Sequence, residues 1–320
     1  MSRMDDMDDS RSSRALHRWS QFVVAWAVLL VFAGANVTST RSGDAIPSWP
    51  EPLFPRDFST PALIEWSHRG VAAWMGIFTL VLAVWTQRRD GRPLVRRAAW
   101  FAVALVLVQA VIGGLRVRFV SAGIDATPTW LKVTHALTGQ AYFATLVGIA
   151  VVLSPSWMRR RQQLDLDVPA MSAMRTGILG VLLLLVQTAL GAFGRHGVLP
   201  REVHAFVALP VLAVVAKLVL TGAWDMPIAA DDIRRAARLL GGLAAVQLAL
   251  GLVTYFIASS GTAPEARETT QVVLINLHVA AGAAMLGTTL AILMRTVHAF
   301  GLPTDDRVAA AERAATGGAS

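Results

Sequence analysis

Long apolar stretches alternate with short charged segments along the whole chain. Eight stretches reach the roughly 20 residues that a helix needs to cross the hydrocarbon core of a bilayer. They cover residues 19–38, 62–86, 98–117, 131–153, 173–194, 202–222, 238–257 and 272–295. Pro210 interrupts the sixth stretch, and Lys217 lies near its end, where a lysine side chain can reach the membrane surface. The pattern predicts an all-α membrane protein with eight transmembrane helices.

The composition excludes several classes of protein and of binding site. Of the 320 residues, 54% are hydrophobic and 16% are charged, whereas a soluble domain carries roughly 25% charged residues. The chain has no cysteine, which excludes disulfides, thiolate metal sites, iron–sulfur clusters and covalent c-type haem attachment. The net charge of +8 lies mostly between the apolar stretches. It therefore indicates membrane topology rather than binding of nucleic acid.

Positive charge is distributed unevenly between the two sets of connecting segments. The segments on the side of the N-terminus carry 19 lysines and arginines, and the segments on the other side carry eight. Because cytoplasmic segments are enriched in these residues, both termini are predicted to be cytoplasmic. The predicted organisation is a tail, a four-helix unit, a linker, a second four-helix unit and a second tail, at residues 1–18, 19–153, 154–175, 173–295 and 296–320.

Four of the seven histidines lie inside predicted helices at a nearly constant spacing. His68, His135, His204 and His278 are 67, 69 and 74 residues apart, which is a period of two membrane helices. Each lies within about two turns of the start of an even-numbered helix. All four are therefore expected at a similar depth on the outer side of the membrane.

The odd-numbered helices contain a second repeated pattern. Gln-x-x-x-Gly occurs near the outer ends of the third, fifth and seventh helices, and the first helix has the glycine alone. These residues are Gln109 with Gly113, Gln187 with Gly191, Gln247 with Gly251, and Gly34. Two interpretations of the glycines remain open, namely close helix packing and clearance for a flat ligand. The two patterns together predict two pseudo-repeated four-helix bundles, or a hairpin repeated four times.

Ionisable side chains inside a membrane are costly and indicate function. Imidazole is an axial ligand of haem iron, and haem binds between the helices of a bundle. The spacing predicts two haem sites, one formed by His68 with His135 and the other by His204 with His278. A purely structural role fits four histidines at one period poorly. A zinc or copper site is disfavoured because carboxylate and thiolate partners are scarce, and a proton relay would need more acids within the membrane.

One acid distinguishes the first histidine from the others. Glu65 precedes His68 by three residues, so both lie on one face of the helix. Beside a haem, this carboxylate could accept a proton, hold a water or stabilise a cation. The alternative is an interfacial acid paired with Arg69 or with a loop arginine. The other three histidines have Lys132, Arg201 and Ile275 at this position. The two halves are therefore expected to differ, with chemistry in the first and plain bis-histidine ligation in the second.

Five cations are expected just outside the four histidines: Arg116, Arg118, Lys132, Arg195 and Arg201. Arginine and lysine bind carboxylates through charge-assisted hydrogen bonds. These side chains are candidate partners of haem propionates, with ordinary loop charges as the alternative.

Taken together, these residues resemble the haem A synthase family. The first outer segment reads Val37-Thr38-Ser39-Thr40-Arg41-Ser42-Gly43 and then Pro47-Ser48-Trp49-Pro50. It is similar to the family's G-x-x-V-T-x-T-x-S-G…P-x-W-P stretch, with Gly34 in place. This likeness also argues against cleavage of the first helix as a signal peptide after Ala33-Gly34-Ala35.

Two further motifs extend the resemblance over about residues 20–295. Glu65-x-x-His68-Arg69 is similar to the family's E-x-x-H-R. Gly113-Gly114-Leu115-Arg116-Val117 is similar to the end of its third helix, and the four histidines match in order and placement.

The resemblance implies oxidation of the C8 methyl of haem O to a formyl group, in two hydroxylations followed by loss of water, to supply haem A for cytochrome oxidase. It implies a first half that holds the substrate haem, with Glu65, His68 and His135 catalytic. It implies a second half that holds a permanent haem b on His204 and His278. The implied setting is the bacterial cytoplasmic membrane, with haem O synthase, cytochrome oxidase assembly factors and an electron donor as partners.

The sequence departs from the family in one respect. Many members carry cysteine pairs in outer loops, and this chain has none, which leaves open a paralogue with altered chemistry. A non-catalytic dihaem b-type electron-transfer cytochrome would use the same fold and the same four ligands. It predicts two permanent haems and little dependence on Glu65. A haem or metal transporter is disfavoured, because the histidines lie near one surface rather than at the midplane.

Overall fold

The computed structural model describes residues 2–46, 48, 57–121, 128–159, 163–263 and 266–317. These residues form ten α-helices and no strand: α1 (Ser2–Ser39), α2 (Thr60–Arg89), α3 (Pro93–Ser121), α4 (Thr129–Val152), α5 (Pro155–Arg159), α6 (Val168–Arg195), α7 (Arg201–Leu220), α8 (Asp231–Ser259), α9 (Thr269–Phe300) and α10 (Asp305–Gly317). Short 3-10 turns η1 (Ser42–Asp44) and η3 (Ile228–Ala230) and a π turn η2 (Thr221–Asp225) complete this set. Pro47, Trp49 and Pro50 of the first outer segment lie outside the described residues.

Eight of these helices, α1 to α4 and α6 to α9, are long and apolar enough to cross a membrane. This confirms the predicted class, an all-α multi-pass membrane protein. Most of the helices extend beyond the predicted apolar stretches, because their ends continue through polar residues suited to the membrane surface. Pro210 does not end α7, which continues to Leu220 before the π turn.

Local side-chain chemistry explains several helix ends. Asp167 caps α6, since its carboxylate accepts a hydrogen bond from the Ala170 amide at 2.7 Å. At the start of α9, the side chains of Glu268 and Gln271 form a reciprocal capping box. Between α2 and α3, Asp90 pairs with Arg92 at 2.5 Å. Burial raises the pKa of Asp90, but hydrogen bonds from Arg92 outweigh burial and hold the pKa below its ordinary value.

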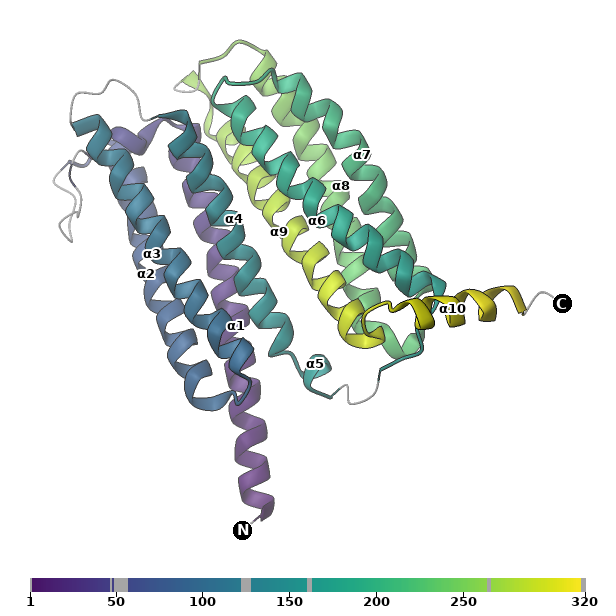
Figure 1. Cartoon of the computed structure of the whole chain (residues 1–320). Coiled ribbons are helices and arrows are strands. Elements are labelled where there is room, and N and C mark those ends of the chain that lie inside the picture. The colour runs from purple at the N-terminus through teal and green to yellow at the C-terminus, as the bar shows by residue number, and fades with distance from the viewer. Residues whose placement is uncertain are drawn as a thin grey trace.

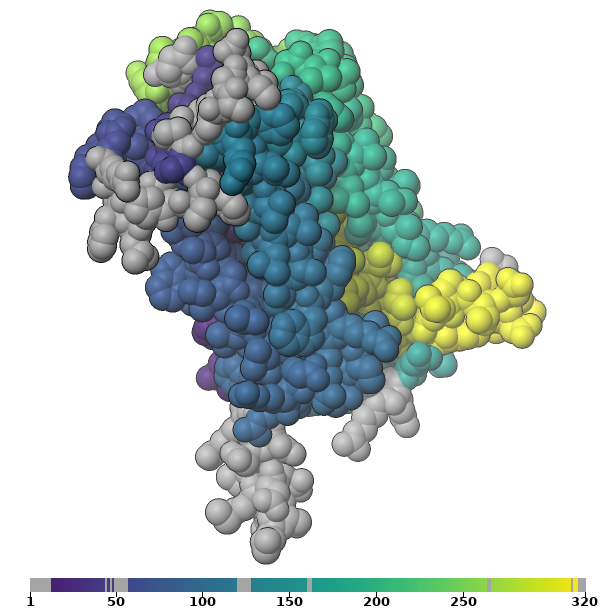
Figure 2. All heavy atoms as spheres, turned by 60° about the vertical axis from the view of Figure 1, so that its left-hand side comes forward, coloured from purple at the N-terminus to yellow at the C-terminus, as the bar shows by residue number. Residues whose placement is uncertain are grey.

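The helices form two groups of four (Figure 1). In the first half, α1 contacts α2, α2 contacts α3, α3 contacts α4, and α4 closes the ring against α1. The second half has the same order of neighbours with α6, α7, α8 and α9. Helix α9 also packs against α1 and α4, and Figure 2 shows its surface between the two halves. A methyl group on Gly287 of α9 would lie 2.9 Å from the Phe143 ring of α4, so this crossing requires glycine. The predicted pseudo-repeat itself stays a prediction.

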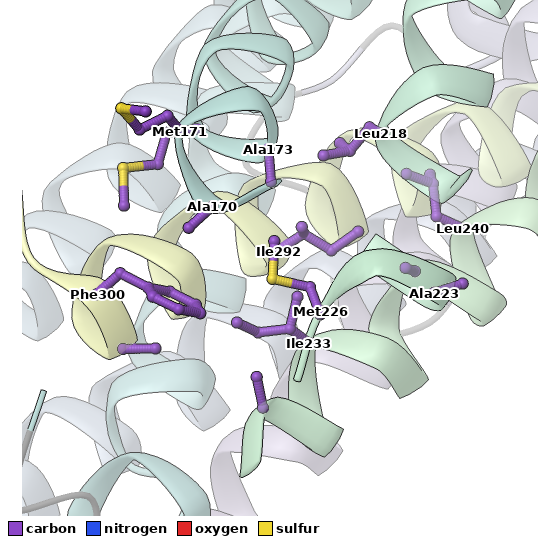
Figure 3. Packing of buried hydrophobic residues seen from close by; sticks show 14 of the residues in the cluster. Ala170, Met171, Ala173, Leu218, Ala223, Met226, Ile233, Leu240, Ile292 and Phe300 are labelled. Carbon is purple, nitrogen blue, oxygen red and sulfur yellow. The ribbon is translucent and has the colours of Figure 1, made fainter. Parts of the chain in front are cut away.

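The buried apolar cluster of each half lies toward one end. We call this the terminal end, because α1 begins there and α10 lies there (Figure 1). In the second half the core includes Ala170, Leu218, Ile233 and Ile292, which come from all four helices (Figure 3). The first half packs residues such as Leu82 of α2 at the corresponding level. Lipid tails are as apolar as these side chains, so this packing contributes mainly dispersion contacts.

The opposite end is packed less closely. We call it the site end, because α2, α4, α7 and α9 begin there with their histidines. In α8, residues 233, 237 and 240 are buried, whereas none of residues 241–259 is. In α7, none of residues 201–210 is buried. The second half is therefore less densely filled along α7 and α8 at this end, whereas the first half buries Ala62, Leu131 and Val133 near its histidines.

Candidate functional site

Each of the four histidines lies against a glycine of the preceding helix. The pairs are His68 with Gly34, His135 with Gly113, His204 with Gly191 and His278 with Gly251. A methyl group on the glycine would lie 3.1 or 3.2 Å from the imidazole Cε1 in the first, third and fourth pairs, and 4.0 Å from it in the second. A β-carbon would therefore crowd three of the four rings.

This contact decides the role of the repeated glycines. They do allow close packing, but the group that packs on them is the imidazole ring rather than a neighbouring backbone. In the first, third and fourth pairs the ring Nδ1 lies closer to the position of such a methyl group than Nε2 does. Nδ1 is thus directed at the preceding helix, and Nε2 is the nitrogen that remains for a ligand in the bundle.

The second-half pair has a geometry suited to one shared metal ion. The rings of His204 and His278 have centroids 6.3 Å apart and planes at 86° to each other. Two imidazoles on opposite sides of an ion, each with its nitrogen about 2 Å from it, place their centroids about 6 Å apart. Among the described residues, no three histidine or acidic side chains converge on one point. The two rings are therefore far enough apart to hold one metal ion between them, and two imidazoles are a ligand set that fits haem iron.

The histidine pair of the first half lies in a more cationic setting. His68 and His135 interact electrostatically with each other and both with Arg116. A methyl group on Gly43 of η1 would lie 3.3 Å from Arg116 Nη2, so this guanidinium extends toward the first outer segment. Arg116 is thus a cation that lies near both histidines of the first half.

Glu65 is buried and both of its carboxylate oxygens accept hydrogen bonds. Oε2 accepts from the Ile46 amide at 2.8 Å, and Oε1 pairs with the Arg69 guanidinium. Arg69 in turn donates to the carbonyls of Ile46 at 3.0 Å and Ser48 at 2.7 Å. The pairing with Arg69 is the alternative that the sequence left open, and it attaches the first outer segment to α2 directly above His68.

A polar cluster that the sequence did not reveal lies between the two halves. Asn276 is fully buried; its side chain accepts from Ser39 Oγ at 2.8 Å and donates to Asn36 Oδ1 at 3.1 Å. Arg195 donates to Ser39 Oγ at 2.6 Å and to the Ala35 carbonyl at 2.9 Å. The cluster joins α1, α6 and α9 within about one turn of Gly34, Gly191 and His278. It therefore connects the surroundings of the two histidine pairs.

The remaining outer cations have different surroundings. Arg201 donates to the Ala258 carbonyl and so ties the start of α7 to the end of α8. Arg118 is exposed. Lys132 lies close enough to His196 to interact with it electrostatically. The five predicted cations thus do not form a single cluster.

The three other histidines lie apart from the two pairs. His298 stacks on Trp157 at the terminal end, with ring centroids 3.8 Å apart, and His17 lies near the start of the first span. His196 follows α6 at the site end. Burial, together with the nearby cations Lys132, Arg195 and Arg116, lowers the pKa of His196 to about 4, so this imidazole is neutral at pH 7.

Comparison with known proteins supports the resemblance drawn from the motifs. No protein-family model matches the chain. A haem A synthase of Exiguobacterium sibiricum is 27% identical over 190 residues, which are 58% of this chain and 60% of that protein. A haem A synthase of Lysinibacillus sphaericus is 38% identical over 104 residues, which are 30% of this chain and 34% of that protein.

A relative with another name matches as well. A protoheme IX farnesyltransferase of Haloarcula marismortui is 32% identical over 120 residues, 37% of this chain and 24% of that protein. The chain thus spans no more than 60% of the length of these curated relatives. The matches confirm the resemblance to the haem A synthase family.

Proposed function

We propose that this chain, whose relatives include haem A synthases, oxidises the C8 methyl of haem O to the formyl group of haem A. The observation that carries the proposal is one scaffold with two pairs of histidines and an acid beside only one of them. A methyl group becomes a formyl group through two hydroxylations and loss of water, which removes four electrons and four protons for each oxygen atom gained. The reaction therefore needs an external oxidant that takes the electrons and a site with a group that can transfer protons. The second pair is then free for a resident redox group.

In this proposal the second half would hold a haem b as prosthetic group, and His204 and His278 would be the residues that bind its iron. The 6.3 Å separation of their ring centroids supports this assignment. When bound, haem b supplies reversible electron transfer. The protein contributes the two imidazoles, held on Gly191 and Gly251, and the loosely packed site end that surrounds them.

The first half binds haem O as substrate between His68 and His135. Arg116, which interacts with both histidines, is the first candidate to bind a propionate. Glu65 has two roles in this proposal: it holds the first outer segment through Arg69 and Ile46, and it carries the carboxylate nearest the substrate for proton transfer.

The partners and the location follow from this activity. The chain would lie in the bacterial cytoplasmic membrane with both termini in the cytoplasm, so that the site end faces outward. Haem O synthase would supply the substrate, and cytochrome oxidase assembly factors would receive haem A. The similarity to a protein named protoheme IX farnesyltransferase is consistent with a place beside the enzyme that makes haem O.

The decisive experiment is extraction and mass identification of haem from the purified protein, produced together with a haem O synthase. We expect haem A or its hydroxylated precursor alongside haem b. Haem b alone, at about two per chain, would contradict the proposal and would favour the dihaem electron-transfer cytochrome.

Testing the role of Glu65 needs variants that separate two effects: the negative charge of its carboxylate, and its hydrogen bonds that attach the first outer segment to α2. Glu65→Gln keeps an oxygen for the Ile46 amide, whereas Arg69→Gln keeps the carboxylate and removes its ion pair. We expect Glu65→Gln and Glu65→Ala to retain haem b and to lose haem A formation, and Arg69→Gln to retain part of it. Equal losses in Glu65→Gln and Arg69→Gln would indicate attachment alone, and an unchanged yield in Glu65→Ala would remove Glu65 from the mechanism.

A further inference from the structure

Arg195, the last residue of α6, directs its guanidinium across the junction of the two halves. Nη2 donates to the Ala35 carbonyl at 2.9 Å and to Ser39 Oγ at 2.6 Å, both in α1. The surrounding helices remove much of the hydration of this guanidinium, although the residue keeps some accessible surface. Both acceptors are neutral, and no carboxylate among the described residues pairs with Arg195. The charge is therefore held between helices without a counter-ion from that part of the chain.

Other cations act at the same junction. Arg267, in the segment before α9, interacts electrostatically with Arg195. Lys132 and Arg116 of the first half act together with Arg195 on the adjacent His196. A charge inside a membrane protein that faces like charges and lacks a counter-ion destabilises the fold, so its presence indicates a function.

The guanidinium is connected to the surroundings of both iron ligands proposed for the second half. Arg195 follows Gly191, on which one ligand ring packs, by four residues or about one helical turn. Ser39 Oγ, which accepts from Arg195, donates in turn to Asn276 Oδ1 at 2.8 Å. Asn276 precedes the other ligand, His278, by two residues, and Arg195 and His278 interact electrostatically. The charge therefore lies beside this site.

The polar cluster fixes the position of this charge. Asn276 is fully buried, and it holds Ser39 while it donates to Asn36 Oδ1 at 3.1 Å. The two acceptors of Arg195, Ala35 and Ser39, are about one helical turn apart, so the guanidinium bonds to two points of α1. Salt screens a charge held in this way less than it screens an exposed charge. Its electric field therefore acts on groups bound nearby in the second half.

We infer that Arg195 raises the reduction potential of the haem b that His204 and His278 would bind. Reduction adds one electron to the iron and lowers the positive charge of the haem by one, so a fixed cation nearby favours the reduced form. The surroundings of a haem are among the means by which a protein sets its potential. The inference rests on the proposed function, in which this haem transfers electrons, and Arg195 acts by its charge without contact with the reacting atoms.

The test changes the charge and the hydrogen bonds of the cluster separately. Arg195→Gln removes the charge and keeps an amide donor, whereas Arg195→Lys keeps the charge. Ser39→Ala removes two hydrogen bonds and leaves the arginine. Asn36→Asp places a carboxylate of the same shape in the cluster. Arg235→Gln is the matched control, because it removes an arginine that pairs with Asp231 at the terminal end.

Each variant is made in the full-length protein carrying His68→Ala and is produced without a haem O synthase. These conditions leave haem b on the second half as the group that is observed. Its midpoint potential is measured by equilibrium redox titration followed by absorbance, and the Tm of each variant is measured in parallel.

We expect Arg195→Gln to lower the midpoint potential by about 59 mV, which is a tenfold change in the ratio of reduced to oxidised haem for one electron. A unit charge some 10 Å away has about this effect at an effective dielectric constant of about 20. Asn36→Asp should lower the potential as well, because its carboxylate compensates the guanidinium. Arg195→Lys, Ser39→Ala and Arg235→Gln should stay close to the parent. A merely structural role would change the Tm without ordering the potentials by charge.

Equal midpoint potentials in Arg195→Gln and Arg195→Lys would overturn the inference. If Arg195→Gln does not retain haem, Asn36→Asp decides, because an unchanged potential there would show that the charge does not act on the iron. The proposed function would survive either result provided that the parent protein still forms haem A with a haem O synthase. A second half that binds no haem in the parent would overturn both.

Discussion

The two halves of this protein place their histidines in the same way but hold them differently. In both, an imidazole at the start of one helix packs on a glycine near the end of the preceding helix. The second half sets its pair 6.3 Å apart, as one shared ion requires, and fastens His204 to Gln187. The first half has an acid, an arginine and an outer segment around His68, and its other histidine, His135, lies beside Gln109. One scaffold thus provides two histidine pairs with different surroundings.

The distribution of packing explains how this is possible. The buried apolar clusters of both halves lie toward the terminal end, where they hold the four helices together. In the second half, α7 and α8 are packed less closely at the site end, so residues can differ there without loss of the core. The apolar cluster of each bundle and its histidines thus lie toward opposite ends.

The comparison predicts its largest effect at the ligands of the second half. We expect His278→Ala to abolish the stable reduced haem spectrum, because it removes a ligand of the iron. Its effect on haem affinity should exceed the roughly 10–100-fold loss that follows removal of a residue that only supports a ligand. His298→Ala is the control, because that ring stacks on Trp157 at the opposite end and should leave the spectrum unchanged. A normal reduced spectrum in His278→Ala would refute the ligand assignment.

The glycines provide the next test, since they differ in how much space separates them from the imidazole ring. A methyl group at Gly191 would lie 3.1 Å from His204 Cε1, whereas one at Gly113 would lie 4.0 Å from His135 Cε1. Gly191→Ala should therefore destabilise the protein by about 1–3 kcal/mol, as overpacking does, and lower its haem content. Gly113→Ala should be tolerated. Thermal unfolding and haem-to-protein ratio measure both, and equal effects would show that the contact with the imidazole is unimportant.

The polar cluster tests whether the halves act as one unit. Asn276→Ala removes two buried hydrogen bonds between α9 and α1, and interhelical bonds in membrane proteins contribute about 0.6 kcal/mol each. We expect a loss of about 1 kcal/mol in unfolding free energy. Thr288→Ala on the same helix is the control, because Thr288 bonds only to the carbonyl of Ala284 within α9. Identical unfolding curves for the two variants would rule out a bridging role for Asn276.

The smallest expected effect is on the pH dependence of stability. Burial and the nearby cations Lys132, Arg195 and Arg116 lower the pKa of His196 to about 4 in the folded protein, from an ordinary value of 6.5. The unfolded chain therefore takes up this proton first, and the stability contributed by the neutral ring is lost as the pH falls from about 6.5 toward 4. The Tm of His196→Gln should consequently decrease less than that of the parent between pH 7 and pH 5. Equal decreases in Tm for His196→Gln and the parent would show that this histidine does not contribute to the pH dependence of stability.

Much of the architecture can be predicted from the sequence because it depends on local properties. The eight spans follow from the length and apolarity of each stretch, which the bilayer requires of any helix that crosses it. The four histidines stand out because a repeat is visible without knowledge of any contact. The departures from the expected limits are at helix ends, where polar residues continue the helix beyond the apolar stretch.

Only the tertiary structure decides which side chains meet. Ser39 and Asn276 are 237 residues apart and hydrogen-bond between the halves, and neither residue alone signals that contact. The repeated glycines and histidines are visible in the sequence, but the rotation of each helix about its axis decides that they face each other. The same rotation directs Glu65 toward Arg69 and the Ile46 amide. Hydropathy determines that a helix crosses the membrane, whereas its rotation depends on packing against distant helices.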